Sequence, residues 1–391
     1  MLKDTKRCGC GFFYEDPAQG CLQQGACSQE KKGRRCAKRR FWLLFSPMKT
    51  TTDSHSPAAG SSRPLSVLIT MDVEEEGLFS GRYQRRNPPV TNVASLRRLT
   101  GLSDDLGFPL TLLCSHAVFT DAAACRVLEE MRDQHGAEIG AHLHHWSTPP
   151  FENEELFCQG TPTRTDKLDR KLLEDRLVSL LEAGEDFQGA PLTSFRMGRW
   201  DLKKCLFPLL HEHGIVVDSS ICPLRSFAGG ADHFLAPGQP YWALGKDVPF
   251  LEVPITQIPL ASFMPSLWQK FSGSKKDAFH FLAALSGSPF WHNDFVMRLC
   301  VKLLQLRSCD VLCVFWHSSE LVPKGSPHVP DAAAADRVLK RIFSFFGWIR
   351  EHVPCRGLTL TQLYKEALAG GGSLHPAYPA REDLGRQEGD W

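Results

Sequence analysis

Ser66–Glu76 reads SVLITMDVEEE, an apolar run that ends abruptly in acidic residues. Its first part, Ser66–Met71, is rich in aliphatic residues and predicts a buried strand. Similar short apolar runs recur along the chain, and between them lie amphipathic stretches with apolar residues three and four positions apart. This alternation predicts parallel strands that are joined by helical crossovers.

The pattern extends over most of the chain. The predicted strands are Ser66–Met71, Pro109–Cys114, Ala137–Leu143, Leu192–Phe195, Ile215–Asp218, Leu251–Val253, Val311–Trp316 and Leu358–Leu360. The predicted helices are Asn92–Leu106, Asp121–His135, Lys167–Ala183, Leu202–His213, Asp294–Leu306 and Ala332–His352. So many strand and helix units over about 300 residues favour an α/β barrel over an open sheet. No Gly-x-Gly-x-x-Gly follows the first strand, so nothing indicates a dinucleotide-binding fold.

Charge is distributed unevenly along the 391 residues, which hold 45 Lys and Arg against 44 Asp and Glu. Residues 1–40 contain ten basic and four acidic residues, a net charge of +6, which leaves 35 − 40 = −5 for the rest. A mildly acidic body gives no support to nucleic-acid binding, so we expect no nucleic-acid partner. A basic leader that binds nucleic acid by itself is the alternative.

The two ends of the chain have the composition of disordered segments. We expect residues 1–60 to be a basic, Cys-rich, disordered leader and linker, because they show no helical or strand period and end in a Ser/Thr/Pro-rich stretch. Met48 is the start that we expect for the natural protein. Residues 61–369 then form the barrel domain, and the Gly- and Pro-rich residues 370–391 form a disordered tail.

The apolar runs are too short for a membrane span. The run nearest the start, Phe41–Phe45, has five residues where a spanning helix needs about 20. We therefore expect no transmembrane segment and a cytoplasmic location, with peripheral membrane association as the alternative. The nine cysteines after residue 40 are predicted to be buried thiols, because several lie inside apolar runs.

Polar residues at the carboxyl ends of the strands are the candidates for chemistry, because a barrel places its active site there. Asp72 and Glu74 follow the first strand two residues apart, so their side chains point the same way on an extended chain. One carboxylate can bind a cation while the other handles protons. A solvated acidic turn is the alternative interpretation of this motif.

Three histidines follow the strand that begins at Ala137, namely His142, His144 and His145. His142 and His144 share a face by alternation, and two histidines with one carboxylate are typical of a catalytic zinc site. Arg196 ends another strand and would keep a neighbouring carboxylate ionised. His317 follows the apolar Val311–Trp316, where burial can tune its pKa for general acid catalysis.

Four segments that end strands resemble motifs of the NodB-type polysaccharide deacetylases, in a divergent bacterial branch. They are TMDVE (Thr70–Glu74), EIGAHLHHW (Glu138–Trp146), SFRMGRW (Ser194–Trp200) and VFWHSSEL (Val314–Leu321), while DSS (Asp218–Ser220) is placed in a further motif. The resemblance covers Leu65–Leu368. It implies a distorted (β/α)7 barrel of the glycoside hydrolase/deacetylase type.

The resemblance also implies a role for each residue. Asp72 is the catalytic base, Arg196 orients it, and His317 is the general acid. Glu74, His142 and His144 bind a divalent metal, zinc in first place and manganese, cobalt or nickel as alternatives. The family pattern H-x-x-x-H would put the second histidine at the position of Trp146, so the second ligand is His144 or His145; we expect His144.

The activity implied is hydrolysis of a linear amide. The expected substrate is an N-acetylated sugar of a polysaccharide or glycan precursor, including a lipid-linked sugar, in the biosynthesis of cell-envelope polysaccharides. Aromatic residues near the predicted barrel mouth, among them Trp146 and Trp200, are candidates for stacking on sugar rings. Two alternatives remain: an allantoinase-like hydrolase of a small amide, and an inactive barrel that only binds carbohydrate.

Overall fold

The computed structural model of the chain describes residues 63–151, 157–158, 161–227, 230–245, 248–272 and 276–370. The predicted leader and, apart from Gly370, the predicted tail lie outside the described residues, so the expectations about them stay predictions. Among the described residues no helix is both long and apolar enough to cross a membrane.

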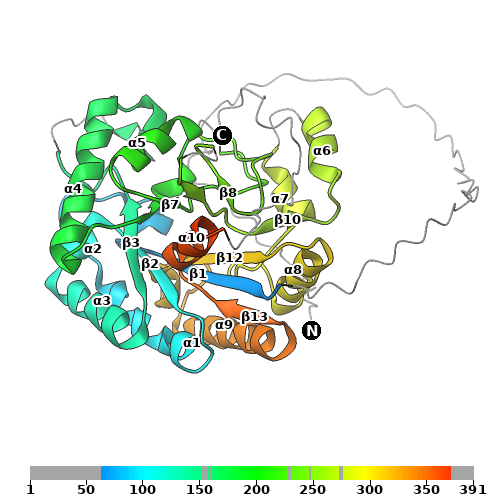
Figure 1. Cartoon of the computed structure of the whole chain (residues 1–391). Helices are drawn as coiled ribbons and strands as arrows, with labels where there is room; N and C mark the ends of the chain where they lie inside the picture. Colours follow the sequence, from blue (N-terminus) through cyan, green and yellow to red (C-terminus); the bar gives the residue numbers. More distant parts are fainter. Residues whose placement is uncertain are drawn as a thin grey trace, which may run out of the picture. The chain divides into compact units, whose positions relative to one another are not determined.

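A curled, mainly parallel sheet is the centre of the fold (Figure 1). Its strands follow the order β12-β1-β2-β3-β6-β7-β9-β8, in which only β8 runs antiparallel to its neighbour, and β13 pairs with the start of β1. The strands of this sheet are β1 (Leu65–Val73), β2 (Leu110–Cys114), β3 (Glu138–Leu143), β6 (Ser194–Met197), β7 (Val217–Asp218), β8 (Tyr241–Trp242), β9 (Leu251–Glu252), β12 (Val311–His317) and β13 (Cys355–Gly357). Strand β12 comes late in the chain but pairs with the first strand, β1, so the last long strand lies beside the first.

Helices follow most strands, and several of them cover the outer face of the sheet, whereas the last one packs against inward-pointing side chains such as Leu68 (Figure 1). They are α1 (Thr100–Asp104), α2 (His116–Phe119), α3 (Ala122–His135), α4 (Arg170–Gln188), α5 (Phe207–Glu212), α6 (Met264–Ser272), α7 (Ala278–Ala283), α8 (Asp294–Leu306), α9 (Ala332–His352) and α10 (Leu360–Leu368). Several begin at a side-chain cap: Asp121, Asn293 and Asp331 accept hydrogen bonds from the first backbone amides of α3, α8 and α9.

Apolar side chains alternate between two sides of the sheet. Along β1, Leu68 points into the barrel, where it packs with residues such as Leu113 and Phe315. Val67 and Ile69 point outward and join the larger core between the sheet and the helices. The buried positions of β1 on both faces explain its continuous apolar sequence, which is typical of a parallel strand covered on both sides.

The barrel is distorted because the gap between β9 and β12 is closed by irregular chain rather than by an eighth paired strand. Thr256, which follows β9, receives a hydrogen bond on Oγ1 from the Cys313 amide at 2.8 Å, and its own amide donates to the Cys313 carbonyl at 2.8 Å. A two-stranded hairpin follows, β10 (Gln257–Pro259) with β11 (Ala284–Ser286), and its connection contains α6 and α7.

The predicted fold class, a distorted (β/α) barrel, is confirmed. The helices Asp294–Leu306 and Ala332–His352 have the predicted bounds. The predicted strand Leu358–Leu360 is wrong: Thr359 caps α10 by accepting from the Gln362 amide, and Gln362 in turn accepts from the Thr359 amide at 2.9 Å. This capping box starts a helix at Leu360, while the neighbouring strand is Cys355–Gly357.

Candidate active site

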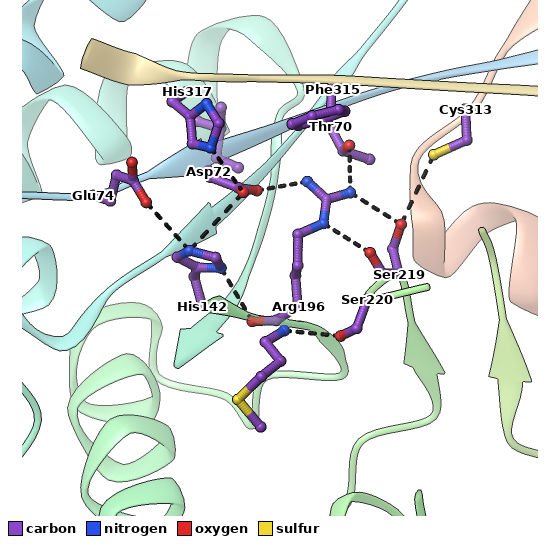
Figure 2. Close-up of polar contacts among 12 residues, drawn as sticks. Thr70, Asp72, Glu74, His142, Arg196, Ser219, Ser220, Cys313, Phe315 and His317 are labelled. Carbon is purple, nitrogen blue, oxygen red and sulfur yellow. Dashed lines mark hydrogen bonds and ion pairs between the residues drawn. The ribbon is translucent and has the colours of Figure 1, made fainter. Parts of the chain in front are cut away.

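Four strand ends bring their polar residues to one place at the carboxyl edge of the sheet (Figure 2). The register of the sheet causes this, because Asp72 on β1 is paired with His317 on β12, and His142 on β3 is paired with Arg196 on β6. All predicted site residues therefore lie in the same neighbourhood. Their roles in a reaction remain predictions.

The acidic run after β1 is buried. Asp72, Glu74 and Glu75 are exposed by only 3%, 3% and 0%, which rules out a solvated acidic turn. Asp72 and Glu74 point to the same side, as the alternation predicts, since both approach the ring of His142. Glu76 has a different role: its Oε1 accepts from the Asn92 amide at 3.0 Å, at the start of the 3₁₀ helix Thr91–Leu99.

Glu74, His142 and His144 form a group whose ligand atoms all lie within 4.8 Å of one another. Glu74 Oε2 is 3.4 Å from His142 Nε2 and 3.2 Å from His144 Nε2. His145 is not part of this group, because its ring nitrogens do not lie within that distance of the other ligand atoms. Of the two alternatives for the second histidine, the geometry favours His144.

Both histidines use Nδ1 for a hydrogen bond, so Nε2 is the ring atom that faces Glu74. His142 Nδ1 lies 3.1 Å from the Arg196 carbonyl, and His144 Nδ1 lies 2.9 Å from Glu75 Oε1. A carbonyl oxygen accepts only, so His142 Nδ1 carries a proton, and Nε2 is the atom that can bind a metal. His142 Nε2 is buried without a hydrogen-bond partner among the described residues. Two imidazole nitrogens and a carboxylate suit a divalent metal such as zinc, so the residues fit the predicted ion.

Glu75 supports this group from behind. Its Oε1 accepts from His144 Nδ1, from Trp146 Nε1 at 3.2 Å and from Ser147 Oγ at 2.8 Å. The Trp146 ring stacks on the His144 ring with centroids 4.2 Å apart. Trp146 is 1% exposed, so it orients a histidine and has no free face for a sugar.

Asp72 and Arg196 form an ion pair in the interior, with Nη1 and Oδ1 2.5 Å apart. Arg196 Nη2 also donates to Thr70 Oγ1 at 2.6 Å and to Ser219 Oγ at 3.0 Å, and Nε donates to the Ser219 carbonyl at 2.8 Å (Figure 2). The guanidinium is thereby fixed on three sides. Its face is covered by Trp200, whose ring centroid is 5.2 Å from Cζ.

His317 lies beside Asp72 on the neighbouring strand β12, with Nε2 3.7 Å from Asp72 Oδ2. Its Nδ1 lies 2.9 Å from Glu320 Oε2, which also accepts from the His317 backbone amide at 3.0 Å. Glu320 thus holds the ring so that Nε2 points into the site. The side chain of His317 is 20% exposed, whereas those of Asp72 and Glu74 are 4% and 5% exposed, so the site opens to solvent beside His317.

The charges set the protonation states. Burial opposes ionisation of Asp72, but Arg196, with His142 and His317, lowers its pKa below the ordinary value. Burial likewise disfavours the charged form of His317, yet Glu74, Glu320 and Asp72 raise its pKa to about 9. At neutral pH the site therefore holds an ionised Asp72 and a protonated His317, the pair that a base and an acid require.

Gly198 leaves room for the His144 ring. A Cβ atom at this position would lie 2.4 Å from His144 Cδ2 and 2.8 Å from the Leu143 carbonyl. After it, Arg199 and Trp200 adopt left-handed backbone angles with φ of 58° and 54°. These angles are costly for residues with side chains, and they turn the chain so that Trp200 returns over Arg196.

Two residues of the site did not emerge from the sequence, Glu75 and Glu320. Both are carboxylates that accept a hydrogen bond from the Nδ1 atom of a histidine. Glu75 directly follows Glu74 in the chain, and Glu320 lies three residues after His317. The signal in the sequence was the length of the acidic run and the Glu three residues after His317. Asp218 of the DSS segment hydrogen-bonds Ser220, whose Oγ accepts from the Met197 amide at 2.8 Å, so this segment supports the Arg196 strand.

Comparison with known proteins supports the fold. No family model matches the chain, and no curated protein sequence matches it. A protein of Parabacteroides distasonis, provisionally described as a glycoside hydrolase/deacetylase, is similar over 82% of this chain and 75% of its own, with a TM-score of 0.51 and 12% identity. The chain shares the fold of this glycoside hydrolase/deacetylase structure.

Two further solved structures are similar to the chain. A protein of Mycobacterium smegmatis, provisionally described as a polysaccharide deacetylase, covers 83% of this chain with 96% of its own, at a TM-score of 0.49 and 17% identity. Puue allantoinase covers 79% of this chain with 92% of its own, at 0.47 and 13%. The predicted resemblance is confirmed for the fold by the P. distasonis structure, and at 12% identity the function depends on the residues of the site.

Proposed function

We propose that the protein is a metal-dependent deacetylase that hydrolyses the acetamide of an N-acetylated sugar. Its substrate is a polysaccharide or a glycan precursor, including a lipid-linked sugar. The observation that carries the proposal is the group Glu74, His142 and His144 beside the Asp72–Arg196 pair. The fold supports it, since the glycoside hydrolase/deacetylase structure from P. distasonis is built in the same way.

Glu74, His142 and His144 would hold the metal through one carboxylate oxygen and two Nε2 atoms. We propose zinc, with manganese, cobalt or nickel as alternatives. A bound divalent metal polarises the acetamide carbonyl and lowers the pKa of water. Glu75 keeps His144 in the tautomer that such binding needs, and the Arg196 carbonyl does the same for His142.

Asp72 is placed to accept the proton of the attacking water. Its Oδ1 is engaged by Arg196, so Oδ2, which faces His142 and His317, is the oxygen that remains for the proton. The charge of Arg196 keeps the carboxylate ionised in a buried position. In this proposal Asp72 is a base and not a metal ligand, so the Asp72–Arg196 pair lies beside Glu74, His142 and His144 and is not part of that group.

His317 is placed to donate a proton to the departing amine. Glu320 binds Nδ1, so the proton on Nε2 faces the site. With a pKa of about 9, raised above its ordinary value against the effect of burial, this histidine is charged at neutral pH. The products are acetate and a free amino sugar. Asp72 then holds the proton taken from water and His317 has lost one, so a proton must return from Asp72 to His317, directly or through solvent, before the next turnover.

We keep the cytoplasm as the proposed location. Eight cysteines whose side chains are described are free thiols, and five of these eight are buried. Free thiols in this number favour a reducing compartment.

The test is acetate release by the purified, metal-loaded protein. Acetate release is measured with N-acetylglucosamine oligomers, N-acetylated sugar nucleotides and lipid-linked N-acetylated sugars. Allantoin, a small cyclic amide without an acetyl group, is assayed separately by the formation of allantoate. The proposal expects acetate from a sugar substrate and none from the Asp72→Asn variant. Turnover of allantoin alone supports the small-amide alternative. Binding of N-acetylated sugars without any acetate release would show an inactive carbohydrate-binding barrel.

A further inference from the structure

Exposed apolar side chains are concentrated in one segment of the chain, residues 260–307. Of the nine large apolar side chains that are exposed among the described residues, eight lie in this segment and the ninth is Leu368. The eight are Leu260, Phe263, Leu267, Phe271, Phe281, Leu282, Phe295 and Leu306. Single exposed apolar residues are common on protein surfaces, but such a concentration marks an interaction surface.

Helix α6 presents a regular apolar stripe. Leu267 and Phe271 on the helix and Phe263, which directly precedes it, are four residues apart and are exposed by 49%, 81% and 67%. Residues at this spacing share one face of a helix. The opposite face is already used, because Met264 and Trp268 pack against a small core that includes Phe279.

Helix α7 continues this surface. It packs against α6 through Trp268 and Phe279, whose ring centroids are 5.8 Å apart. Two of its residues, Phe281 and Leu282, are exposed by 49% and 67%. Both helices lie together at the same side of the sheet, in yellow-green in Figure 1. We call Phe263, Leu267, Phe271, Phe281 and Leu282 the α6–α7 face.

The sequence segment that contains this face differs in charge from the other residues after position 40. Residues 260–307 contain six Lys and Arg and two Asp and Glu, a net charge of +4. The other residues after position 40 then carry (35 − 6) − (40 − 2) = −9. Lys270 lies on α6 itself and is exposed. Aromatic and aliphatic side chains with lysines beside them are typical of helices that lie at an anionic membrane surface.

We propose that the α6–α7 face docks the protein on an anionic phospholipid bilayer. A second copy of the chain is a poorer occupant, because a twofold contact would bring two segments of net charge +4 against each other. An anionic headgroup layer complements that charge, and the acyl region takes the apolar stripe. The inference is independent of the proposed catalytic function.

The test uses the full chain and vesicles. Sedimentation is measured with phosphatidylcholine vesicles and with equimolar phosphatidylcholine and phosphatidylglycerol. We expect binding to the mixed vesicles that weakens as salt rises. In the variant Phe263→Ser/Leu267→Ser/Phe271→Ser the partition coefficient should fall at least about tenfold, since three apolar side chains are lost. Lys270→Glu should reduce binding to the mixed vesicles.

The matched control is Leu368→Ser, which removes an exposed apolar side chain outside the segment and should leave binding unchanged. Circular dichroism and acetate release from a water-soluble substrate report whether the triple variant folds. Equal vesicle binding by the wild type and the folded triple variant would overturn the inference. The same result is expected if the leader, and not the α6–α7 face, binds the lipid. A dimer that the triple variant converts to a monomer, without vesicle binding, would also overturn it. Neither result affects the proposed deacetylase activity.

Discussion

The guanidinium of Arg196 and the carboxylate of Asp72 form a fully enclosed ion pair, 2.5 Å between Nη1 and Oδ1. Their strands, β6 and β1, are not neighbours, because β2 and β3 lie between them in the sheet. The pair therefore spans the interior of the curled sheet. The stability of the barrel therefore depends on the charge of Asp72, the proposed base.

Replacing Arg196 by Met should have two effects. Asp72 loses its partner in a buried position, so the free energy of unfolding should fall by about 3 to 5 kcal/mol. The pKa of Asp72 should rise, because burial is no longer outweighed by Arg196. The acid limb of the kcat/KM profile should then move to higher pH. Urea unfolding and a pH–rate profile measure the two effects.

The double variant Asp72→Asn/Arg196→Met is the control for this pair. It removes both charges, so it should recover part of the stability that Arg196→Met loses. A double variant as unstable as the sum of the single variants would show that the two groups contribute separately.

Replacing Glu320 by Gln should move the alkaline limb of the pH–rate profile. The pKa of His317 is raised to about 9 and Glu320 contributes to this rise. Without the carboxylate the pKa falls, and the protonated acid is lost at lower pH. We expect the limb to shift downward by about one pH unit. Glu76→Gln, a carboxylate that binds Asn92 outside the site, should leave the profile unchanged.

Metal binding should release a proton. Burial lowers the pKa of His144, but Glu75 and Glu74 outweigh it and raise the pKa to about 10 in the metal-free protein. His144 is then charged at pH 7 and must lose the Nε2 proton to become a ligand. The apparent affinity should rise about tenfold per pH unit below that pKa. Titration calorimetry in buffers of different ionisation enthalpy measures the proton, and a value of zero would contradict this account.

Gly198→Ala should weaken metal binding. The added Cβ would approach His144 Cδ2 to 2.4 Å and displace the ring. Because the orientation of ligands controls affinity, we expect a loss of at least about tenfold. Gly347→Ala in helix α9 is the matched control, since nothing lies within 4 Å of its added Cβ. Competition with a chromophoric chelator measures both affinities, and equal values for the two variants would show that Gly198 has no such role.

The sequence predicted the main strands because they are buried on both faces. Continuous apolar runs such as Val311–Trp316 have few other interpretations, and the polar residue after each run marks the strand end. The strand Leu358–Leu360 was mispredicted because its apolar residues belong to a helix start. The T-x-x-Q spacing of Thr359 and Gln362 carried that information.

Supporting residues were harder to predict than the site itself. Asp72 and Glu74 could be paired because an extended strand alternates strictly. Glu75 and Glu320 lie where the chain leaves the strand, and there the direction of a side chain depends on the turn. The exposed apolar face of α6 could not be predicted from the sequence either. Leu267 and Trp268 are both apolar, and only the fold decides which of them is exposed.

The metal content of the purified protein and two histidine variants tests the central claim most directly. After reconstitution with zinc, manganese, cobalt or nickel and removal of excess ion, elemental analysis should find about one metal per chain in the wild type. His142→Ala should lose it, while His145→Ala should retain it, because His145 lies outside the ligand group. Wild-type protein without metal, or His142→Ala with full metal content, would contradict the account.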